Sequence, residues 1–516
     1  MAEGGGIAKT FWKKYEKQEC AFLRFSPFSV SVAAGNLHLQ SFHKYICMDL
    51  HFLQSFVQAY RIIEDWVIDE VNKKLIRELK ECLQKMIQKY RETNLDIWGF
   101  KQLPEISGID LTTDKYLDLL FSTAFGKVEG NHLKDKHGQV PAYTLAVIAP
   151  FMRLYVYLAQ HILPLTELYP NNTSDHIYKK WLLYYSSQRV QDIAESTEQA
   201  LNKISASSKN YDLKMIEKLY HQAMKLLVGF FAVQSISQPT VVPLYRVQDV
   251  NKRQLAIFSN FSLTRPGIKD RSSLKYLKTE FHDRTSEYYR ELKHYIETIT
   301  ASDPAISKFD YDGLCIALKQ VTEFKKKTTE KMEESGVMKD LSLDNIQNAI
   351  PKPPLFDDWR EFFQKTVKAK CPSIQLSVIS HFSFGDMIRN AFPSDLEALN
   401  VHSDELEYTE DSVTTGKIVK AESPFDKFED FPEVLKVYIG ATVEDLLCLV
   451  QADIGIVLGS KILILRKVAE RFGVSFIPLL NGVVKNQMEL GDWKPKSGIL
   501  YTVDSFAEIQ AFIFGL

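Results

Sequence analysis

The chain has 516 residues, of which 45% are hydrophobic and 25% charged, which is the composition of an ordinary soluble globular protein. Its formal net charge of −2 gives no general electrostatic attraction to nucleic acid or to an anionic membrane. No apolar run approaches the ~20 residues that span a bilayer, so we expect neither a nucleic-acid nor a membrane partner. The length exceeds that of a usual single core and predicts two domains, or three.

The N-terminal stretch and the cysteines favour a cytoplasmic protein. MAEGGGIAKTFWKKYEK has neither an apolar signal core nor the acid-poor, Arg/Ser-rich character of a transit peptide. The six cysteines are scattered, with no CxxC pair and no histidine at ligand spacing. This pattern favours reduced, mostly buried thiols over a disulfide framework or a structural metal site.

The first half of the chain has a helical pattern. Leu75, Leu79, Leu83, Met86 and Tyr90 recur at spacings of three and four, which marks one apolar stripe on an amphipathic helix. Similar stripes cover residues 42–60, 116–125, 142–158 and 216–231, with turn sequences between them. We expect an all-α bundle over residues 1–236.

Several polar residues interrupt these apolar stretches. Asp49 and His51 stand in YICMDLHFLQSF, Glu129 in GKVEG and Tyr185 in KKWLLYYSS. A buried carboxylate needs partners or a ligand to offset its desolvation. A structural role is the commoner explanation for one such residue, so the residues alone leave the role of Asp49 open.

Residues 237–254 read as a linker, because they contain two prolines and lie where the periodicity changes from helical to strand-like. Beyond them, helical stretches alternate with short apolar runs at residues 255–258, 374–379, 434–439, 454–458, 476–479 and 499–503. This alternation predicts a doubly wound α/β domain with a parallel sheet over residues 255–516. Residues 266–354 are charged and helical, and form an insertion after the first strand.

Four stretches of the first half resemble the TenA (thiaminase II-like) family, which hydrolyses aminopyrimidines in thiamin salvage: SPFSVSVAAGNLHLQSFHKYICMDLHFLQSFVQAY, GKVEG, PAYTLAVIAPFMRLY and YKKWLLYYSS. The domain order resembles plant bifunctional thiamin-salvage proteins, in which this domain precedes a thiamin monophosphate phosphatase of the haloacid dehalogenase (HAD) type. The resemblance implies a TenA-like bundle followed by a HAD-like domain with residues 266–354 as a helical cap. Because TenA-like bundles commonly associate, it also implies a homo-oligomer through the helical domain.

The resemblance gives the helical domain a pocket with altered chemistry. Asp49 matches the family aspartate that holds the pyrimidine amine, and Tyr185 matches a pocket tyrosine. The nucleophilic cysteine of the family falls on Phe151 and its catalytic glutamate on Leu227, and neither side chain can do covalent or acid–base work. The other candidates for the pocket lining are Tyr45, Tyr143 and Tyr155.

The second domain resembles a phosphatase without its acids. In LAIFSNFSLT, the two aspartates of the HAD loop DxDx[TV] are replaced by Asn260 and Ser262. Ser380 matches the residue that hydrogen-bonds the phosphoryl group, and Lys427 matches the lysine that neutralises it. An amide is a poor nucleophile, and a serine hydroxyl has too high a pKa to act as the general acid.

The magnesium ligands of the HAD family are also reduced. YIGATVEDLL stands where the family has GDSxxD, so the first acid has become Ala441 while Asp445 remains. Mg²⁺ prefers oxygen ligands anchored by carboxylates. We therefore expect no metal and no cofactor, although the family uses Mg²⁺.

Three functions remain open at this point. The first is a non-hydrolytic enzyme, of isomerase or cyclase type, acting on a small organic molecule in a helical pocket that Phe151 and Leu227 make more apolar. The second is a non-catalytic protein that binds a thiamin-related ligand or a partner protein, and the third is residual phosphatase or aminopyrimidine hydrolase activity. The sequence favours the first, and its candidate catalytic residues are Asp49, His51, Glu129 and Tyr185.

Overall fold

The computed structural model of the chain describes residues 6–97, 110–133, 136–168, 176–207, 212–234, 236–247, 255–260, 275–301, 308–343, 346, 362–364, 374–380, 384–391, 400–421, 434–459, 462–489, 493 and 496–516. It divides into two compact units. The helical unit comprises Met1–Val247, Val483–Asp492 and Ala511–Leu516, and the sheet unit comprises Gln248–Gly482 and Trp493–Gln510.

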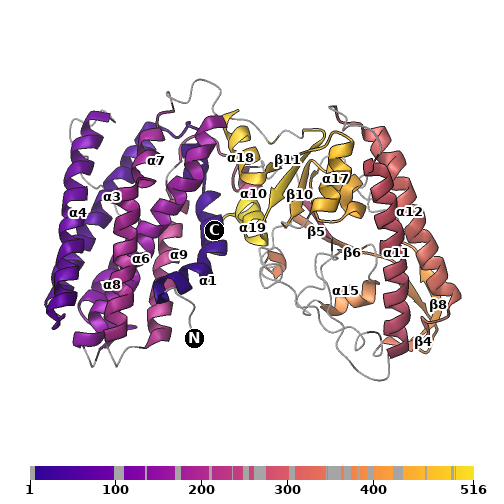
Figure 1. The fold of residues 1–516 in the computed structure, drawn as a ribbon, viewed down its shortest axis with the longest axis horizontal. Helices are drawn as coiled ribbons and strands as arrows, with labels where there is room; N and C mark the ends of the chain where they lie inside the picture. Colours follow the sequence, from indigo (N-terminus) through magenta and orange to yellow (C-terminus); the bar gives the residue numbers. More distant parts are fainter. Residues whose placement is uncertain are drawn as a thin grey trace. The chain divides into compact units, whose positions relative to one another are not determined.

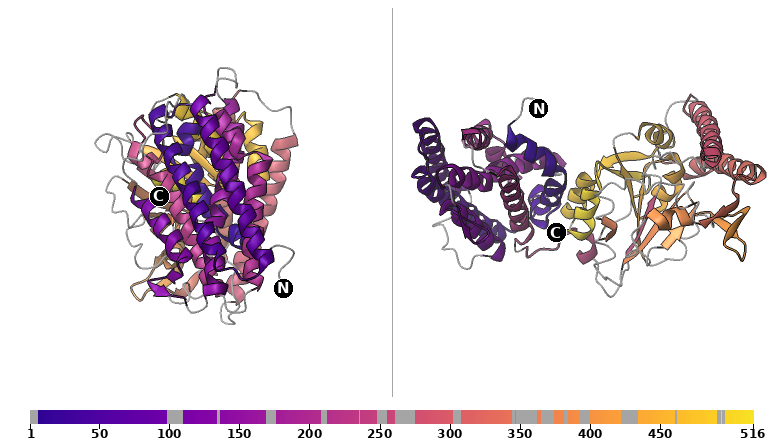
Figure 2. Two further views of the ribbon diagram at one scale, coloured as in Figure 1. Left: turned by 90° about the vertical axis from the view of Figure 1, so that its left-hand side faces the viewer. Right: turned by 90° about the horizontal axis from the view of Figure 1, so that it is seen from below.

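The helical unit is a bundle of long helices, as the apolar stripes predict (Figure 1). Its central helix α6 packs against α8 and α9, and α3 packs against α4; Figure 2 shows the long helices side by side. The helices are α1 (Ile7–Arg24), α2 (Pro27–Ala33), α3 (Leu39–Glu64), α4 (Glu70–Ile97), α5 (Leu111–Ala124), α6 (Lys136–Ile162), η1 (Leu163–Leu168), α7 (Lys179–Tyr185), α8 (Gln188–Ser207), α9 (Leu213–Ala232) and α10 (Leu244–Val247). A short hairpin of β1 (Lys127–Val128) and β2 (Asn131–His132) lies between α5 and α6.

Side-chain caps fix where several of these helices begin. The Ser26 hydroxyl accepts a hydrogen bond from the Ser29 amide at 3.2 Å, and Pro27 occupies the first helical position of α2. Asp110 accepts from the first-turn amides of α5, and Asp212 does the same for α9. The turn chemistry in the sequence therefore sets the helix boundaries.

Helix α6 is the most apolar helix of the bundle core. The stretch His137–Leu168 is long and apolar enough to cross a membrane by length and composition alone: its most apolar window of 18 residues has a mean hydropathy of 1.4, but 89% of that window is buried inside the structure. Such burial is typical of the central helix of a bundle.

The helical unit also contains segments from much later in the chain. The buried Gln487 side chain accepts a hydrogen bond from the Val241 amide at 2.9 Å and donates one to the Pro239 carbonyl at 3.0 Å. The backbone carbonyl of Gln487 accepts a hydrogen bond from the Asn36 side-chain amide at 2.7 Å. Residues after position 482 therefore complete the polar contacts of a unit that begins at the N-terminus.

The sheet unit is built on a seven-stranded sheet in the order β11-β12-β10-β9-β3-β5-β6. Every pairing within it is parallel, so the prediction of an α/β domain with a parallel sheet is confirmed. The strands are β3 (Leu255–Asn260), β5 (Ile374–Ile379), β6 (Asn400–His402), β9 (Leu435–Gly440), β10 (Ile454–Leu458), β11 (Ser475–Pro478) and β12 (Ile499–Val503). The helices of the sheet unit are α15 (Gly385–Ala391), η7 (Val443–Asp445), α16 (Leu446–Gln451) and α17 (Leu463–Arg471). Two further helices, α18 (Leu479–Met488) and α19 (Phe506–Phe514), begin in the sheet unit and end in the helical unit.

Strand β3 is central in this sheet, between β5 and β9, and all its residues are buried. The chain runs from β3 to β5 and β6 on one side, and then returns to place β9 on the other side. In an open α/β sheet, ligands bind at the carboxyl ends of the strands where the strand order reverses. The end of β3, at Asn260, therefore lies at the edge where a site is expected.

The inserted segment is partly helical and partly extended. It contains the long helices α11 (Lys275–Ala301) and α12 (Tyr311–Glu334), followed by β4 (Lys339–Ser342). Strand β4 pairs with β8 (Val413–Val419), which pairs with β7 (Glu405–Tyr408), so three antiparallel strands accompany the two helices. The helices α11 and α12 agree with the helical character expected for residues 266–354, but strand β4 also lies within these bounds, and residues 405–419 share its small sheet and its hydrophobic cluster.

Candidate functional site

Asp49 is a buried carboxylate of the helical unit with only one of its oxygens paired. It lies on α3 and has no solvent exposure. Its Oδ2 atom accepts hydrogen bonds from the hydroxyls of Tyr90 and Tyr185, each at 2.6 Å. Its Oδ1 atom has no hydrogen-bond partner within the described part of the chain. Burial raises the pKa of Asp49 to about 6, although the hydroxyls of Tyr185, Tyr90 and Tyr155 act in the opposite direction.

Further aromatic residues surround this carboxylate. Tyr45 lies one helical turn before Asp49 on α3, so the two share a face. The ring centroids of Trp181 lie 5.6 Å from Tyr45 and 5.3 Å from Tyr185, and Tyr155 lies 4.8 Å from Tyr185. We call Asp49, Tyr45, Tyr90, Tyr155, Trp181 and Tyr185 the Asp49 cluster.

Three more polar atoms of the Asp49 cluster are buried without a hydrogen-bond partner among the described residues: the Tyr45 and Tyr155 hydroxyls and Trp181 Nε1. Burial, and then the Asp49 charge, raise the pKa of both tyrosines. Both tyrosines therefore stay neutral near pH 7 and can donate a hydrogen bond.

Phe151 and Leu227 provide an apolar wall beside the cluster. Both are fully buried. The Phe151 ring stacks on Tyr155 at a centroid distance of 4.4 Å. Leu227 lies one turn before Phe230 and Phe231 on α9, whose rings lie 5.9 Å from Tyr45 and 5.4 Å from Tyr155, respectively. No thiol or carboxylate stands at either of these two positions.

Three of the candidate residues do not join the Asp49 cluster. His51 follows Asp49 by two residues, and positions two apart on a helix do not face each other. Glu129 lies in the β1–β2 turn at φ 51°, with its side chain 53% exposed and ion-paired to Lys218 on α9. The Tyr143 hydroxyl accepts a hydrogen bond from the Asp212 amide at 3.3 Å, at the start of α9. The structure thus does not bring His51 or Glu129 to Asp49.

Two members of the cluster were not singled out from the sequence. Tyr90 appears there only as one member of the apolar stripe of α4, and Trp181 as part of KKWLLYYSS. A tyrosine that replaces an aliphatic residue at a core position carries a hydroxyl that needs a partner, and this signal could have identified Tyr90.

In the sheet unit, Asn260 and Asp445 face each other at the carboxyl edge. Both are completely buried. Asn260 Nδ2 donates to Asp445 Oδ1 at 2.5 Å, and the Tyr438 hydroxyl donates to the same oxygen at 2.8 Å. The other oxygen, Oδ2, accepts from the Ala441 and Thr442 amides, each at 2.9 Å. Asp445 thereby closes a capping box with Thr442 at the start of η7.

This donor set does not fit a magnesium ion. The Thr442 hydroxyl also donates to Asp445 Oδ2, at 3.0 Å, so both carboxylate oxygens are occupied by donors of the chain itself. Ala441 offers no oxygen from its side chain, and the part of the chain that the structure describes contains no cluster of three metal-binding side chains. Ser262 and Lys427 lie outside the described residues.

A pocket of about 360 Å³ opens beside this edge, between α11 and α12 and the loops after the sheet strands. Ser380 lines it together with three lysines, whereas Asn260, Ala441 and Asp445 are not part of its lining. The three lysines are Lys325, Lys326 and Lys420, and the other charged or hydroxyl-bearing or imidazole side chains of the lining are Tyr288, Thr322, Thr329, His402, Asp404 and Glu444.

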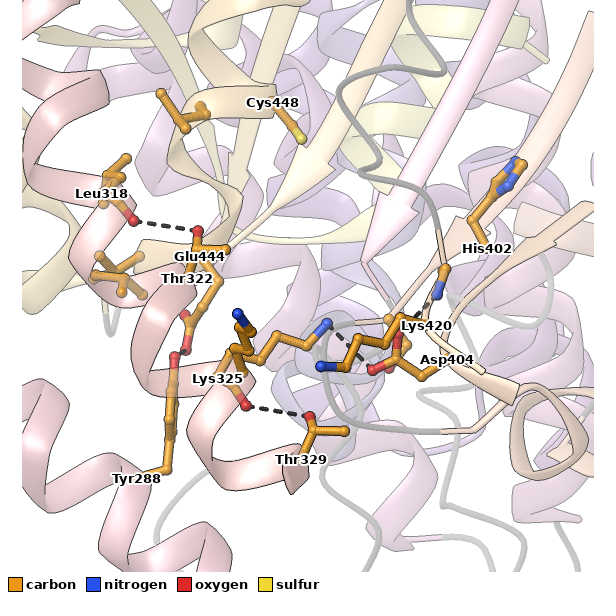
Figure 3. Close-up of a pocket in the computed structure, with 16 residues that line it drawn as sticks. Tyr288, Leu318, Thr322, Lys325, Thr329, His402, Asp404, Lys420, Glu444 and Cys448 are labelled. Carbon is orange, nitrogen blue, oxygen red and sulfur yellow. Dashed lines mark hydrogen bonds and ion pairs between the residues drawn. The ribbon is translucent and has the colours of Figure 1, made fainter. Parts of the chain in front are cut away.

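Two contacts join the inserted helices to the rest of this pocket (Figure 3). The Tyr288 hydroxyl of α11 donates to Glu444 at 2.8 Å, and Lys325 Nζ of α12 lies 3.5 Å from Asp404. Lys420 points toward the same space as Lys325. Since Lys325 and Lys420 are partly balanced by Asp404 and Glu444, the pocket has mixed charge.

Comparison with known proteins gives one relative of high similarity. The chain is 37% identical to the bifunctional TH2 protein of Arabidopsis thaliana, over 556 aligned positions that cover 98% of this chain and 88% of that protein. No family model matches the chain. The Arabidopsis protein is described as mitochondrial, which differs from the cytoplasmic location that the sequence favours.

Three solved structures match the first part of the chain, each over 44% of its length. A TenA homologue from P. horikoshii is 19% identical and covered to 96%, with a TM-score of 0.34. A TenA family transcription regulator from a Silicibacter species is 16% identical, and the alignment covers 95% of its chain with a TM-score of 0.35. A TenA homologue from Pyrococcus furiosus is 13% identical, and the alignment covers 100% of its chain, also with a TM-score of 0.35. At TM-scores this low, the three likenesses carry no weight.

The family of this chain is assigned from the Arabidopsis protein, because the similarity extends over 98% of this chain and 88% of that protein. The chain belongs to the family of the bifunctional TH2 protein, as its resemblance to bifunctional thiamin-salvage proteins predicts.

Proposed function

We propose that the helical unit binds a small thiamin-related molecule with an aromatic amine, and that it acts on this molecule without hydrolysis. The observation that carries the proposal is that Asp49 Oδ1 and the hydroxyls of Tyr45 and Tyr155 have no hydrogen-bond partner among the residues that the structure describes. Buried polar atoms are nearly always hydrogen-bonded. Such a group of unpaired atoms is what a site for a polar ligand presents before the ligand binds.

The Asp49 cluster suits an aromatic amine in both charge and shape. Tyr90 and Tyr185 hold Oδ2, which leaves Oδ1 to accept an N–H of the ligand. The neighbouring aromatic rings can pack against a flat heterocycle. A pKa of about 6 places Asp49 near the range in which a carboxyl group exchanges protons efficiently at neutral pH.

The non-hydrolytic character follows from Phe151 and Leu227. Both are fully buried, Phe151 with its ring stacked on Tyr155, and neither supplies a nucleophile or an acid. Proton transfer by Asp49 would then suffice for an isomerisation or cyclisation, in which no bond to water is made.

Binding without turnover is the second candidate. A specific observation favours it: His51 and Glu129 lie away from Asp49, so Tyr185 is the one other predicted catalytic residue that joins Asp49 in the cluster. The two candidates share the binding step and differ only in whether a product appears.

For the sheet unit we propose a HAD-like domain without phosphatase activity. The support is the central β3 strand with Asn260 at its carboxyl end, next to Ala441 and Asp445 after β9. Cys448 also lines the pocket, but burial raises the pKa of its thiol, so it is a poor substitute nucleophile.

Titration calorimetry with the aminopyrimidine half of thiamin tests the binding site. We expect binding to the wild type, loss of binding in Asp49→Ala, and retention in the matched control His51→Ala on the same helix. Binding that survives Asp49→Ala would contradict the assignment. Mass spectrometry and chromatography of the recovered ligand then separate an enzyme, which changes it, from a binding protein, which returns it intact.

Incubation of the full chain with thiamin monophosphate and Mg²⁺ tests the sheet unit. No phosphate release above the blank is expected. Release at ordinary phosphatase rates that disappears in Lys427→Ala would show that this site is active after all.

The cellular location and the assembly state remain predictions. A cytoplasmic location is tested by fractionation, and the homo-oligomer through the helical domain by light scattering.

A further inference from the structure

The carboxylate of Asp445 is saturated by the chain itself. It accepts five hydrogen bonds, from Asn260 Nδ2, the Tyr438 hydroxyl, the Ala441 amide, and the Thr442 amide and hydroxyl. A carboxylate offers about four lone-pair positions. A magnesium ion would have to displace several of these donors before it reached an oxygen at ~2.0–2.1 Å.

Asn260 is the residue that makes this arrangement possible without a metal. It ends the central strand β3 and is completely buried. A carboxylate only accepts hydrogen bonds, so the amide nitrogen of Asn260 is the end that faces Asp445. An aspartate at position 260 would instead place two buried carboxylates against each other, and such a pair needs a cation or a shared proton.

The backbone around Asp445 holds it in this place. A Cβ atom on Gly440 would lie 2.7 Å from the Cβ of Asp445, so the glycine at the end of β9 lets the side chain approach. The capping box with Thr442 then fixes the carboxylate at the start of η7. Asp445 is therefore positioned by its own segment, and Asn260 approaches it from the neighbouring strand.

We infer that the amide of Asn260 replaces a divalent cation between β3 and the loop after β9. The carboxyl edge of the sheet is held by a hydrogen bond, and the stability of the sheet unit does not depend on divalent metal. The same reasoning makes Asn260→Asp a single change that creates a cation site, with Asp445 as the second carboxylate. This inference concerns the sheet unit alone and does not rest on the ligand proposed for the helical unit.

Thermal unfolding of the full chain in EDTA, MgCl₂ or MnCl₂ at neutral pH tests the inference. The midpoint of the wild type should agree within about 1 °C in all three solutions. The midpoint of Asn260→Asp in EDTA should lie more than about 5 °C below its own midpoint in MgCl₂ or MnCl₂. Calorimetric titration of Asn260→Asp with MnCl₂ should show one saturable site that the wild type lacks. If Asn260→Asp folds only with metal, purification in MgCl₂ followed by transfer to EDTA gives the same comparison.

The matched control exchanges the two residues. In the double variant Asn260→Asp with Asp445→Asn, one amide again faces one carboxylate, so its midpoint should be independent of metal. A saturable stabilisation of the wild type by Mg²⁺ would overturn the inference. It would equally be overturned if Asn260→Asp had the same midpoint with and without metal, since the two carboxylates would then share a proton.

Discussion

The buried charge of Asp49 makes the stability of the helical unit depend on pH in a defined direction. Its pKa is raised from 3.8 to about 6 by burial. Between these two values the folded protein keeps a proton that the unfolded chain has released. Raising the pH through this window therefore destabilises the folded state, and the loss is complete once the pH exceeds the folded pKa.

The magnitude follows from the size of the shift. About 2 pKa units at ~1.4 kcal/mol each give ~3 kcal/mol in total, of which ~2 kcal/mol falls between about pH 4.5 and about pH 7.5. Asp49→Asn removes the titration but keeps an acceptor for the Tyr90 and Tyr185 hydroxyls. The free energy of unfolding of the wild type should therefore fall relative to that of Asp49→Asn as the pH rises.

Hydrogen exchange of peptides from α3 and α6 is the suitable assay, because it reports on the helical unit alone. Wild type and Asp49→Asn are compared at the same pH, so that intrinsic exchange rates cancel. A raised pKa at Asp49 would be refuted if the difference in protection between the two proteins stayed constant across this pH range. It would also be refuted if the protection of the wild type increased relative to that of Asp49→Asn as the pH rises.

Three further predictions concern residues that pack or pair in the helical unit. Phe151→Ala should lower the free energy of unfolding by about 3–5 kcal/mol, because the ring is fully buried; a loss below about 1 kcal/mol in urea unfolding would mean that the ring is poorly packed. Glu129→Ala should change stability by less than about 1 kcal/mol and leave ligand binding intact, because its ion pair with Lys218 is exposed; a loss of binding by calorimetry would return Glu129 to the site. Gln487→Ala should cost about 1–3 kcal/mol for each buried backbone group that it leaves unpaired, measured by hydrogen exchange of the 236–247 segment; unchanged exchange there would contradict the contacts described for Gln487.

The course of the helices and of the main sheet could be predicted from the sequence because both depend on local periodicity. Leu79, Leu83, Met86 and Tyr90 are all buried on one face of α4, as their spacing requires. The apolar runs at residues 255–258 and 454–458 became β3 and β10. The strands β4, β6 and β7 were missed because runs of three or four residues give little periodic signal. Strand β8 was also missed, since only three of the seven residues in VTTGKIV are apolar.

The site was harder to predict because it depends on long-range pairing. Nothing local in the sequence shows that Asn260 meets a residue 185 positions away, or that the Tyr90 hydroxyl reaches Asp49. His51 could have been excluded from periodicity alone, since it lies two residues after Asp49 on one helix. Glu129 could not, because its direction depends on the tight turn between Gly126 and Gly130, both of which have positive φ.

The return of residues 483–492 and 511–516 to the helical unit has a consequence for synthesis. Domains generally fold in order as the chain leaves the ribosome, but here the buried partners of Val241 and Pro239 are made more than two hundred residues later, at Gln487. Until Gln487 has been made, the Val241 amide and the Pro239 carbonyl lack these hydrogen-bond partners. A nascent chain stalled before residue 483 should accordingly be cut by protease near residue 241, and the released full-length protein should be resistant there.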